Sequence, residues 1–125
     1  MRVMVIRKAD QSTEAGAAPT QELFRAMMAY NGEMAKAGVF REGVGLRPSG
    51  TGARVRFRAG KPLVTDGPFA ETKELIAGFT MLEVASLDEA IAWVKRWPRE
   101  DGDVELEIRP LFEAEDFAEL MKQEL

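Results

Sequence analysis

The chain has 125 residues, of which 46% are hydrophobic and 30% charged, a composition typical of folded and not of disordered proteins. It contains no cysteine and no histidine, which excludes disulfides, thiolate metal sites, cysteine nucleophiles and the usual imidazole base. No apolar run approaches the roughly 20 residues that span a bilayer, and the N-terminus predicts a strand instead of a secretion signal. We therefore expect a single domain over residues 1–125, in the cytoplasm and without membrane contact.

The net charge of −4 is unevenly distributed along the chain. Residues 1–61 contain 11 of the 17 basic and 5 of the 21 acidic residues, a net charge of +6, so residues 62–125 carry −10. Opposed charges of this kind steer self-association or an anionic ligand, unless they intermix in the folded protein. Because the chain is acidic overall and its basic stretch is short, we expect no binding of nucleic acid.

The first third of the chain predicts a strand, a loop and a helix. Residues 1–7 are rich in β-branched side chains, and residues 3–6 are apolar on both alternating faces, which indicates a strand covered on both sides. Residues 8–18 show no periodicity and predict a loop, long enough to act as a lid. Residues 19–38 predict a helix, because proline suits its first turn and glycine the position after its last. The expected core side of this helix is formed by Leu23, Met27, Tyr30 and Met34.

Glycine is frequent in the next segment, residues 39–52, which predicts a short strand near 42–47 followed by an irregular connection. Glycines 43 and 45 remove side chains from one face of this strand. Such a face either admits a ligand or a second backbone, or marks a bulged edge strand.

Residues 54–65 predict a β-hairpin that turns at Ala59 and Gly60. Basic and apolar residues alternate in its first strand, so the arginines share one face and Phe57 lies on the other. The three arginines at positions 54, 56 and 58 either bind a carboxylate or phosphate or form a solvated face.

The stretch Asp-Gly-Pro-Phe-Ala-Glu-Thr-Lys-Glu, residues 66–74, is the segment that any functional site should touch. Its first three residues are typical of turns, Phe69 can anchor the turn, and residues 71–74 can form one helical turn beside Asp66. Asp66 is the candidate catalytic residue, although its carboxylate could instead only satisfy backbone donors. The predicted ligand-binding residues are Asp66, Gly67, Pro68, Phe69, Phe79 and Met81.

The second half of the chain predicts strands at residues 76–84 and 104–108 and a helix between them. Residues 76–84 are apolar on both faces, with Phe79 and Met81 on the same one. Ser86, followed three residues later by Glu89, predicts a capping box at the start of the helix. The residues expected to point inward from this helix, which Trp97 and Pro98 should end, are Leu87, Ala90, Ile91 and Val94.

After Pro110 a short acidic helix is expected, with Phe117, Leu120 and Met121 on one side, docked on a neighbouring element or on a partner subunit.

This order of elements predicts an α+β fold: a ferredoxin-like βαββαβ domain with an inserted β-hairpin, an antiparallel sheet and both helices on one face. Two helices cover only one face of such a sheet. Because residues 3–6 and 76–84 are apolar on both sides, the other face must also be covered, most economically by a second copy of the chain. The sequence therefore predicts a homodimer.

Residues 66–74, followed by Ile-Ala-Gly-Phe-Thr-Met-Leu-Glu-Val at 76–84, resemble the DGPF branch of the YCII-related family. The resemblance extends from Met1 to Pro110. It implies membership of the dimeric α/β barrel superfamily, in which two sheets pack together and leave clefts. It supports a fold more strongly than a function.

Some members of that family resemble lyase- or dehydrochlorinase-like enzymes with a proposed His/Asp pair, and Asp66 occupies the position of that aspartate. No histidine exists here, so an arginine, Tyr30 or a substrate group would have to replace the imidazole. Haem is disfavoured because neither histidine nor cysteine can bind its iron. A carboxylate Mg²⁺ site at Asp66, Glu71 and Glu74 has no recognised spacing, so we expect no metal and no cofactor.

Two functions stay open. In the first, a small-molecule binding protein or acid/base accessory enzyme uses Asp66 at an apolar cleft lined by Phe69, Phe79 and Met81. In the second, the protein is a regulatory module, because DGPF-type domains resemble partners of extracytoplasmic-function sigma factors. The acidic C-terminal helix or the basic hairpin would then be the contact surface.

Overall fold

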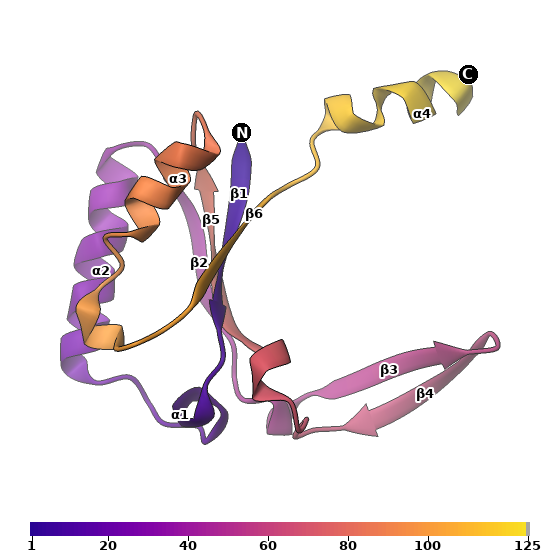
Figure 1. The fold of residues 1–125 in the computed structure, drawn as a ribbon, viewed down its shortest axis with the longest axis horizontal. Helices are drawn as coiled ribbons and strands as arrows, with labels where there is room; N and C mark the ends of the chain where they lie inside the picture. The colour runs from indigo at the N-terminus through magenta and orange to yellow at the C-terminus, as the bar shows by residue number, and fades with distance from the viewer. Residues whose placement is uncertain (125) are drawn as a thin grey trace.

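The computed structural model of the protein describes residues 1–124, and it shows a four-stranded antiparallel sheet with helices on one face (Figure 1). The strand order is β2-β5-β1-β6, which is the ferredoxin-like order once the inserted hairpin is set aside. The predicted α+β class and topology are therefore confirmed. The strands of this sheet are β1 (Arg2–Lys8), β2 (Phe40–Gly45), β5 (Ile76–Glu83) and β6 (Leu106–Pro110).

The inserted hairpin forms a sheet of its own, from β3 (Ala53–Arg58) and β4 (Lys61–Asp66), and projects away from the rest of the chain (Figure 1). The predicted turn at Ala59 and Gly60 is confirmed, with φ values of 50° and 78°. Such left-handed angles at both central residues match the twist of a two-residue hairpin.

The longest helix, α2 (Gln21–Lys36), lies within the predicted residues 19–38, but Pro19 precedes the cap instead of standing in the first turn. The Thr20 side chain accepts a hydrogen bond from the Leu23 amide, and Gly38 adopts the left-handed φ of 76° that follows many helices. The helix α3 (Leu87–Val94) covers the same face of the sheet. The shorter elements are α1 (Gln11–Glu14), α4 (Ala118–Glu124) and single turns at Ser49–Thr51, Thr72–Glu74, Arg99–Asp101 and Ala114–Phe117.

The core lies between the two helices and the sheet. Tyr30 and Met34 of α2 and Ala90 of α3 are buried there. Val3, Val5 and Leu82 of the strands complete this core, together with Val39 just before β2 and Val84 just after β5. The predicted core side of α2 is thus confirmed in its C-terminal half by Tyr30 and Met34. Met27 packs against the same core cluster.

Several local predictions differ from the structure: α3 ends at Val94 and not at Trp97, and the last strand spans Leu106–Pro110 and not 104–108. Residues 8–18 are not wholly a loop, because Asp10 and Thr13 bond to each other's backbone in a capping box that starts α1. In α3, the Ser86 cap is confirmed and Ala90 points inward, but Leu87 and Ile91 are exposed to 42% and 36%. The cause is that α3 lies over β1 and β6 at the border of the sheet, so only a narrow side of it is covered.

The face of the sheet opposite the helices is apolar at its centre and only half-buried. Met4 pairs with Met81 and Ile6 with Phe79 across β1 and β5, and all four side chains point away from the buried Val3 and Val5. We call these four residues the open face.

Among residues 1–124 no helix has both the length and the apolar character that crossing a membrane requires.

Candidate functional site

The Asp66–Phe69 turn lies at the base of the hairpin, where β4 ends. Asp66 is exposed and pairs with Ala53 in the hairpin, and its carboxylate makes no hydrogen bond or ion pair within the described part of the chain. Phe69 is half-buried, and the Arg54 guanidinium lies 3.9 Å above its ring centre, a cation–π contact. Thr72–Glu74 forms the expected turn, but no side chain caps it.

The turn is connected to α1 through Ser49. The Phe69 amide donates to Ser49 Oγ at 3.1 Å, while the Ser49 hydroxyl and amide donate to the two carboxylate oxygens of Glu14 at 2.5 and 2.9 Å. The hydrogen bond from the Ser49 hydroxyl lowers the pKa of Glu14 below its ordinary value. Gly67 packs so closely on the Ser49 carbonyl that a Cβ atom there would overlap it. The Asp66–Phe69 turn therefore contacts the segment around Ser49, and this segment is hydrogen-bonded to Glu14 of α1.

Within one chain, the predicted ligand-binding residues do not come together in a single place. Residues 66–69 surround the base of the hairpin, whereas Met81 belongs to the open face. Phe79 also belongs to the open face and lines a pocket that the sequence did not predict. A shared site for these six residues stays a proposal that needs a second copy of the chain.

That pocket lies between the N-terminal half of α2 and the sheet, and has a volume of about 340 Å³. It continues outward beneath α1 and the following loop into a second hollow of about 430 Å³. The apolar part of the wall includes Leu23, Met27, Ala77 and Trp97. Size and apolar lining are those of a small-molecule site.

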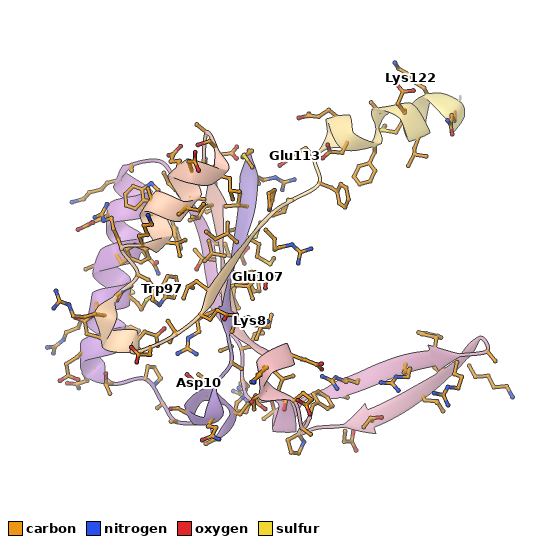
Figure 2. The ribbon with its side chains drawn as sticks, in the orientation of Figure 1. Lys8, Asp10, Trp97, Glu107, Glu113 and Lys122 are labelled. Atoms are coloured by element: carbon orange, nitrogen blue, oxygen red, sulfur yellow. The ribbon has the colours of Figure 1, made fainter. Side chains whose placement is uncertain are left out.

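A nearly buried ion pair forms the polar end of this pocket. The Arg7 guanidinium donates to Asp101 from Nε at 3.1 Å and from Nη2 at 2.8 Å, and Nη1 donates to Asp10 at 3.1 Å. The side chains of Arg7 and Asp101 are only 12% and 10% exposed. Trp97 Nε1 donates to Asp101 at 2.9 Å, and Figure 2 shows Trp97 beside α2 and Asp10 at α1.

The bonds to Asp101 raise the pKa of Arg7 above its ordinary value, so the guanidinium stays charged. Two carboxylates face one guanidinium, so the polar end of the pocket is negative overall and repels anions. Arg7 continues the inward alternation of Val3 and Val5, and a charge on the buried side of a strand is the sequence signal of this ion pair.

The pocket also contains a buried hydrogen-bond acceptor without a donor. Asn31 lines it, and Asn31 Oδ1 is buried with no partner among residues 1–124. Gly43 and Gly45 line the opposite wall, and a Cβ atom on Gly45 would meet nothing within 4 Å. The bulged edge strand is confirmed, because β2 is at the edge of the sheet and has a register shift. Its bare face borders the pocket, and the admission of a ligand there stays a prediction.

Tyr30, a possible replacement for the missing imidazole, is held in the core. Its hydroxyl donates to the Trp93 carbonyl at 2.7 Å, and burial raises its pKa to about 12. A phenol with that pKa does not exchange protons readily near neutral pH. Within residues 1–124 no group of three or more acidic side chains is placed to hold a metal ion. The side chains of Asp66, Glu71 and Glu74 therefore do not form such a group.

Comparison with known proteins places the chain in a family. It is similar to an uncharacterised protein of Rhizobium meliloti (strain 1021), with 35% identity over 92 residues, 73% of this chain and 74% of that protein. A looser similarity joins it to the solved structure of 5-chloro-2-hydroxyhydroquinone dehydrochlorinase (TftG) from Burkholderia phenoliruptrix AC1100, in complex with 2,5-dihydroxybenzoquinone. The two share 15% identity and a TM-score of 0.49 over 93% of this chain and 98% of that one. The family model of the YCII-related domain matches residues 1–115, and the chain therefore belongs to the YCII-related family.

Proposed function

We propose that the protein is a homodimer that binds a small molecule in the pocket between α2 and the sheet. The observation that carries this proposal is the buried, unpartnered Oδ1 of Asn31 in the wall of the pocket. An acceptor left without a donor in the interior costs about 1–3 kcal/mol. Because Oδ1 has almost no surface open to a water-sized probe, we expect the Asn31 amide to turn toward the pocket when a ligand binds, and a ligand that then donates a hydrogen bond to Oδ1 recovers this energy.

The lining defines the class of ligand. The apolar walls favour a ring or a short branched carbon skeleton, and Asn31 Oδ1 requires a hydroxyl or an N–H group. The two aspartates around Arg7 disfavour a carboxylate or phosphate. The best match is a small uncharged ring compound with a hydroxyl group, for which phenol is the simplest probe.

The proposal is tested by titrating the protein with phenol, toluene and benzoate and following backbone amides by NMR. We expect phenol to shift amides of α2, β2 and β5 at a lower concentration than toluene, which lacks the donor, or benzoate, which is an anion. Gly45→Val should fill the pocket and abolish these shifts, because its added Cβ meets no atom within 4 Å and folding is retained. Equal binding of phenol by the wild type and Gly45→Val would overturn the proposal.

The homodimer is supported by the open face. Met4, Ile6, Phe79 and Met81 form a continuous apolar centre that no helix of the same chain covers. In a two-fold dimer this surface would meet its own copy, which is the commonest arrangement of soluble oligomers.

The test of the dimer is its mass by sedimentation equilibrium. The wild type should sediment with twice the mass of one chain, and Met81→Lys should dissociate because it places a charge in the centre of the open face. Met28→Lys is the matched control, since Met28 is 61% exposed on α2, away from the sheet. A wild-type monomer, or a Met81→Lys variant that stays a dimer, would contradict this part.

Asp66 stays a separate proposal, as the acid or base of an accessory enzyme. It is supported by its place at the base of the hairpin, from which a second copy could exclude water. Asp66→Asn tests it: in a turnover assay with small cyclic compounds the variant should lose activity while its circular dichroism spectrum stays that of the wild type. Unchanged turnover would remove Asp66 from the mechanism.

The alternative function is a contact with an extracytoplasmic-function sigma factor, which rests on the resemblance of the sequence alone. A pull-down with the purified sigma factor tests it, using a hairpin variant with Arg54, Arg56 and Arg58 changed to glutamate as control. Recovery by the wild type alone would support this role, and failure to recover the factor would remove it.

A further inference from the structure

The projecting hairpin has two chemically distinct faces. The register pairs Val55 with Val64 and Phe57 with Pro62, so these residues form an apolar face. The opposite face is basic, formed by Arg54, Arg56, Arg58 and Lys61 together with Leu63 and Thr65. The predicted common face of the arginines is thereby confirmed.

Within residues 1–124 no other element covers the apolar face of this hairpin. Phe57 is 71% and Val64 68% exposed, and each strand is paired only with the other. A two-stranded hairpin alone is marginally stable in water, and apolar surface of this kind marks an interaction site. The hairpin therefore requires a partner.

The C-terminal segment, residues 112–121, has the complementary surface. Phe112 is 75% exposed, and Leu120 and Met121 are each 61% exposed. Beside these apolar side chains lie the carboxylates of Glu115, Asp116 and Glu119, which are also exposed. The apolar side of this segment matches the apolar face of the hairpin, and its acids are opposite in charge to the arginines on the other face of the same hairpin.

One chain cannot bring the two surfaces together. The C-terminal segment follows β6, whose Pro110 pairs with Val3 at the start of β1, whereas β5 follows the hairpin and its Ile76 pairs with Lys8 at the end of β1. Both project on the side of the sheet without helices, from its opposite ends (Figure 1). A second copy packed upside down on the open face would place its C-terminal segment at the hairpin of the first.

We propose that in the homodimer each hairpin packs against the C-terminal segment of the second copy, so that two identical clasps close the interface. This inference rests on the dimer of the proposed function and not on its ligand. Two-fold symmetry supplies both clasps at once, because each copy offers one hairpin and one C-terminal segment.

Cysteine cross-linking tests the clasp cleanly, since the chain has no cysteine of its own. Phe57→Cys and Leu120→Cys are introduced in separate chains that differ in mass by a tag, mixed after reversible unfolding and oxidised. We expect the mixed disulfide dimer to predominate. If sedimentation shows a dimer but Phe57→Cys chains cross-link to each other, or no cross-link forms, the clasp is overturned while the dimer survives; a monomer overturns both.

Charge reversal provides the second measurement. Changing Arg54, Arg56 and Arg58 to glutamate should raise the dimer dissociation constant about tenfold or more. Changing Glu115, Asp116 and Glu119 to lysine in the same chain should restore it. If the combined variant is no tighter than the arginine variant, the two surfaces do not meet.

Discussion

Ser49 and Glu14 are joined by two hydrogen bonds, and Ser49 Oγ also accepts one from the amide of Phe69. The Asp66–Phe69 turn is therefore linked to α1, which covers the outer part of the pocket. In the single chain the turn acts on the pocket through this link, because its own residues do not line it.

Breaking this link should loosen α1. We expect Glu14→Gln to increase hydrogen exchange of the amides of residues 11–14, and Glu71→Gln, an exposed residue, to leave it unchanged. Hydrogen exchange followed by mass spectrometry measures both. Faster exchange in both variants would assign the effect to charge alone and contradict the link.

The same link predicts a pH dependence. The pKa of Glu14 is lowered in the folded protein, so its contribution is present above the ordinary value of 4.5 and is lost as pH falls through the lower, folded value. After correction for the intrinsic pH dependence of amide exchange, the protection of α1 should therefore fall under acidic conditions in the wild type. In Glu14→Gln this loss of protection should be absent.

The stability of the fold should depend on Arg7 and Asp101 being present together. Asp101→Asn leaves the guanidinium of Arg7 nearly buried without its main counter-ion, and we expect a loss of about 3 kcal/mol in unfolding free energy. Replacing both, with Arg7→Met and Asp101→Leu, should recover part of that loss because no charge is left unpaired. Urea denaturation measures the three proteins, and a double variant less stable than Asp101→Asn would contradict this account.

Tyr30 is the one tyrosine of the chain, so its titration can be read directly from phenolate absorbance. We expect a midpoint of about 12 in the folded protein, against 10.0 for the ordinary phenol in the urea-unfolded chain. A raised pKa means that the stability from neutral Tyr30 is intact below pH 10 and is lost as pH rises through the folded value. A folded-state midpoint equal to the unfolded one would show that Tyr30 is exposed to water.

Gly67 should tolerate no side chain. In Gly67→Ala the Cβ atom would overlap the Ser49 carbonyl, so the turn or the segment around Ser49 must shift, at a cost of about 1–3 kcal/mol. Gly52→Ala is the matched control, because its Cβ would approach the Ser49 oxygen at an ordinary 3.7 Å. Thermal unfolding should separate the two, and equal melting temperatures would contradict the close packing.

The sequence predicted the fold well, because its signals are local. Ser86 caps α3, Gly38 ends α2, Ala59 and Gly60 form the hairpin turn, and residues 3–6 are apolar on both faces of β1. Each of these depends on a few neighbouring residues.

The pocket could not be predicted in the same way, because it joins residues far apart in the chain. Arg7 donates a hydrogen bond to Asp101, which is 94 positions away in the sequence. That Asn31 Oδ1 has no hydrogen-bond donor can be recognised only once all its neighbours in space are known. The alternating glycines at 43 and 45 were the one local sign of the pocket. The prediction that centred on Asp66 identified a turn that organises this region, and its chemistry is still to be tested.

The central claim is that a small hydroxylated ring binds between α2 and the sheet, and a crystal soaked with 4-bromophenol tests it most directly. The anomalous signal of bromine marks the position of the ring. We predict one strong peak per chain between Leu23 and Gly45, with the phenol hydroxyl donating to Asn31 Oδ1. A pocket without bromine at a concentration that saturates binding in solution, or a ring bound only at the hairpin, would contradict the account.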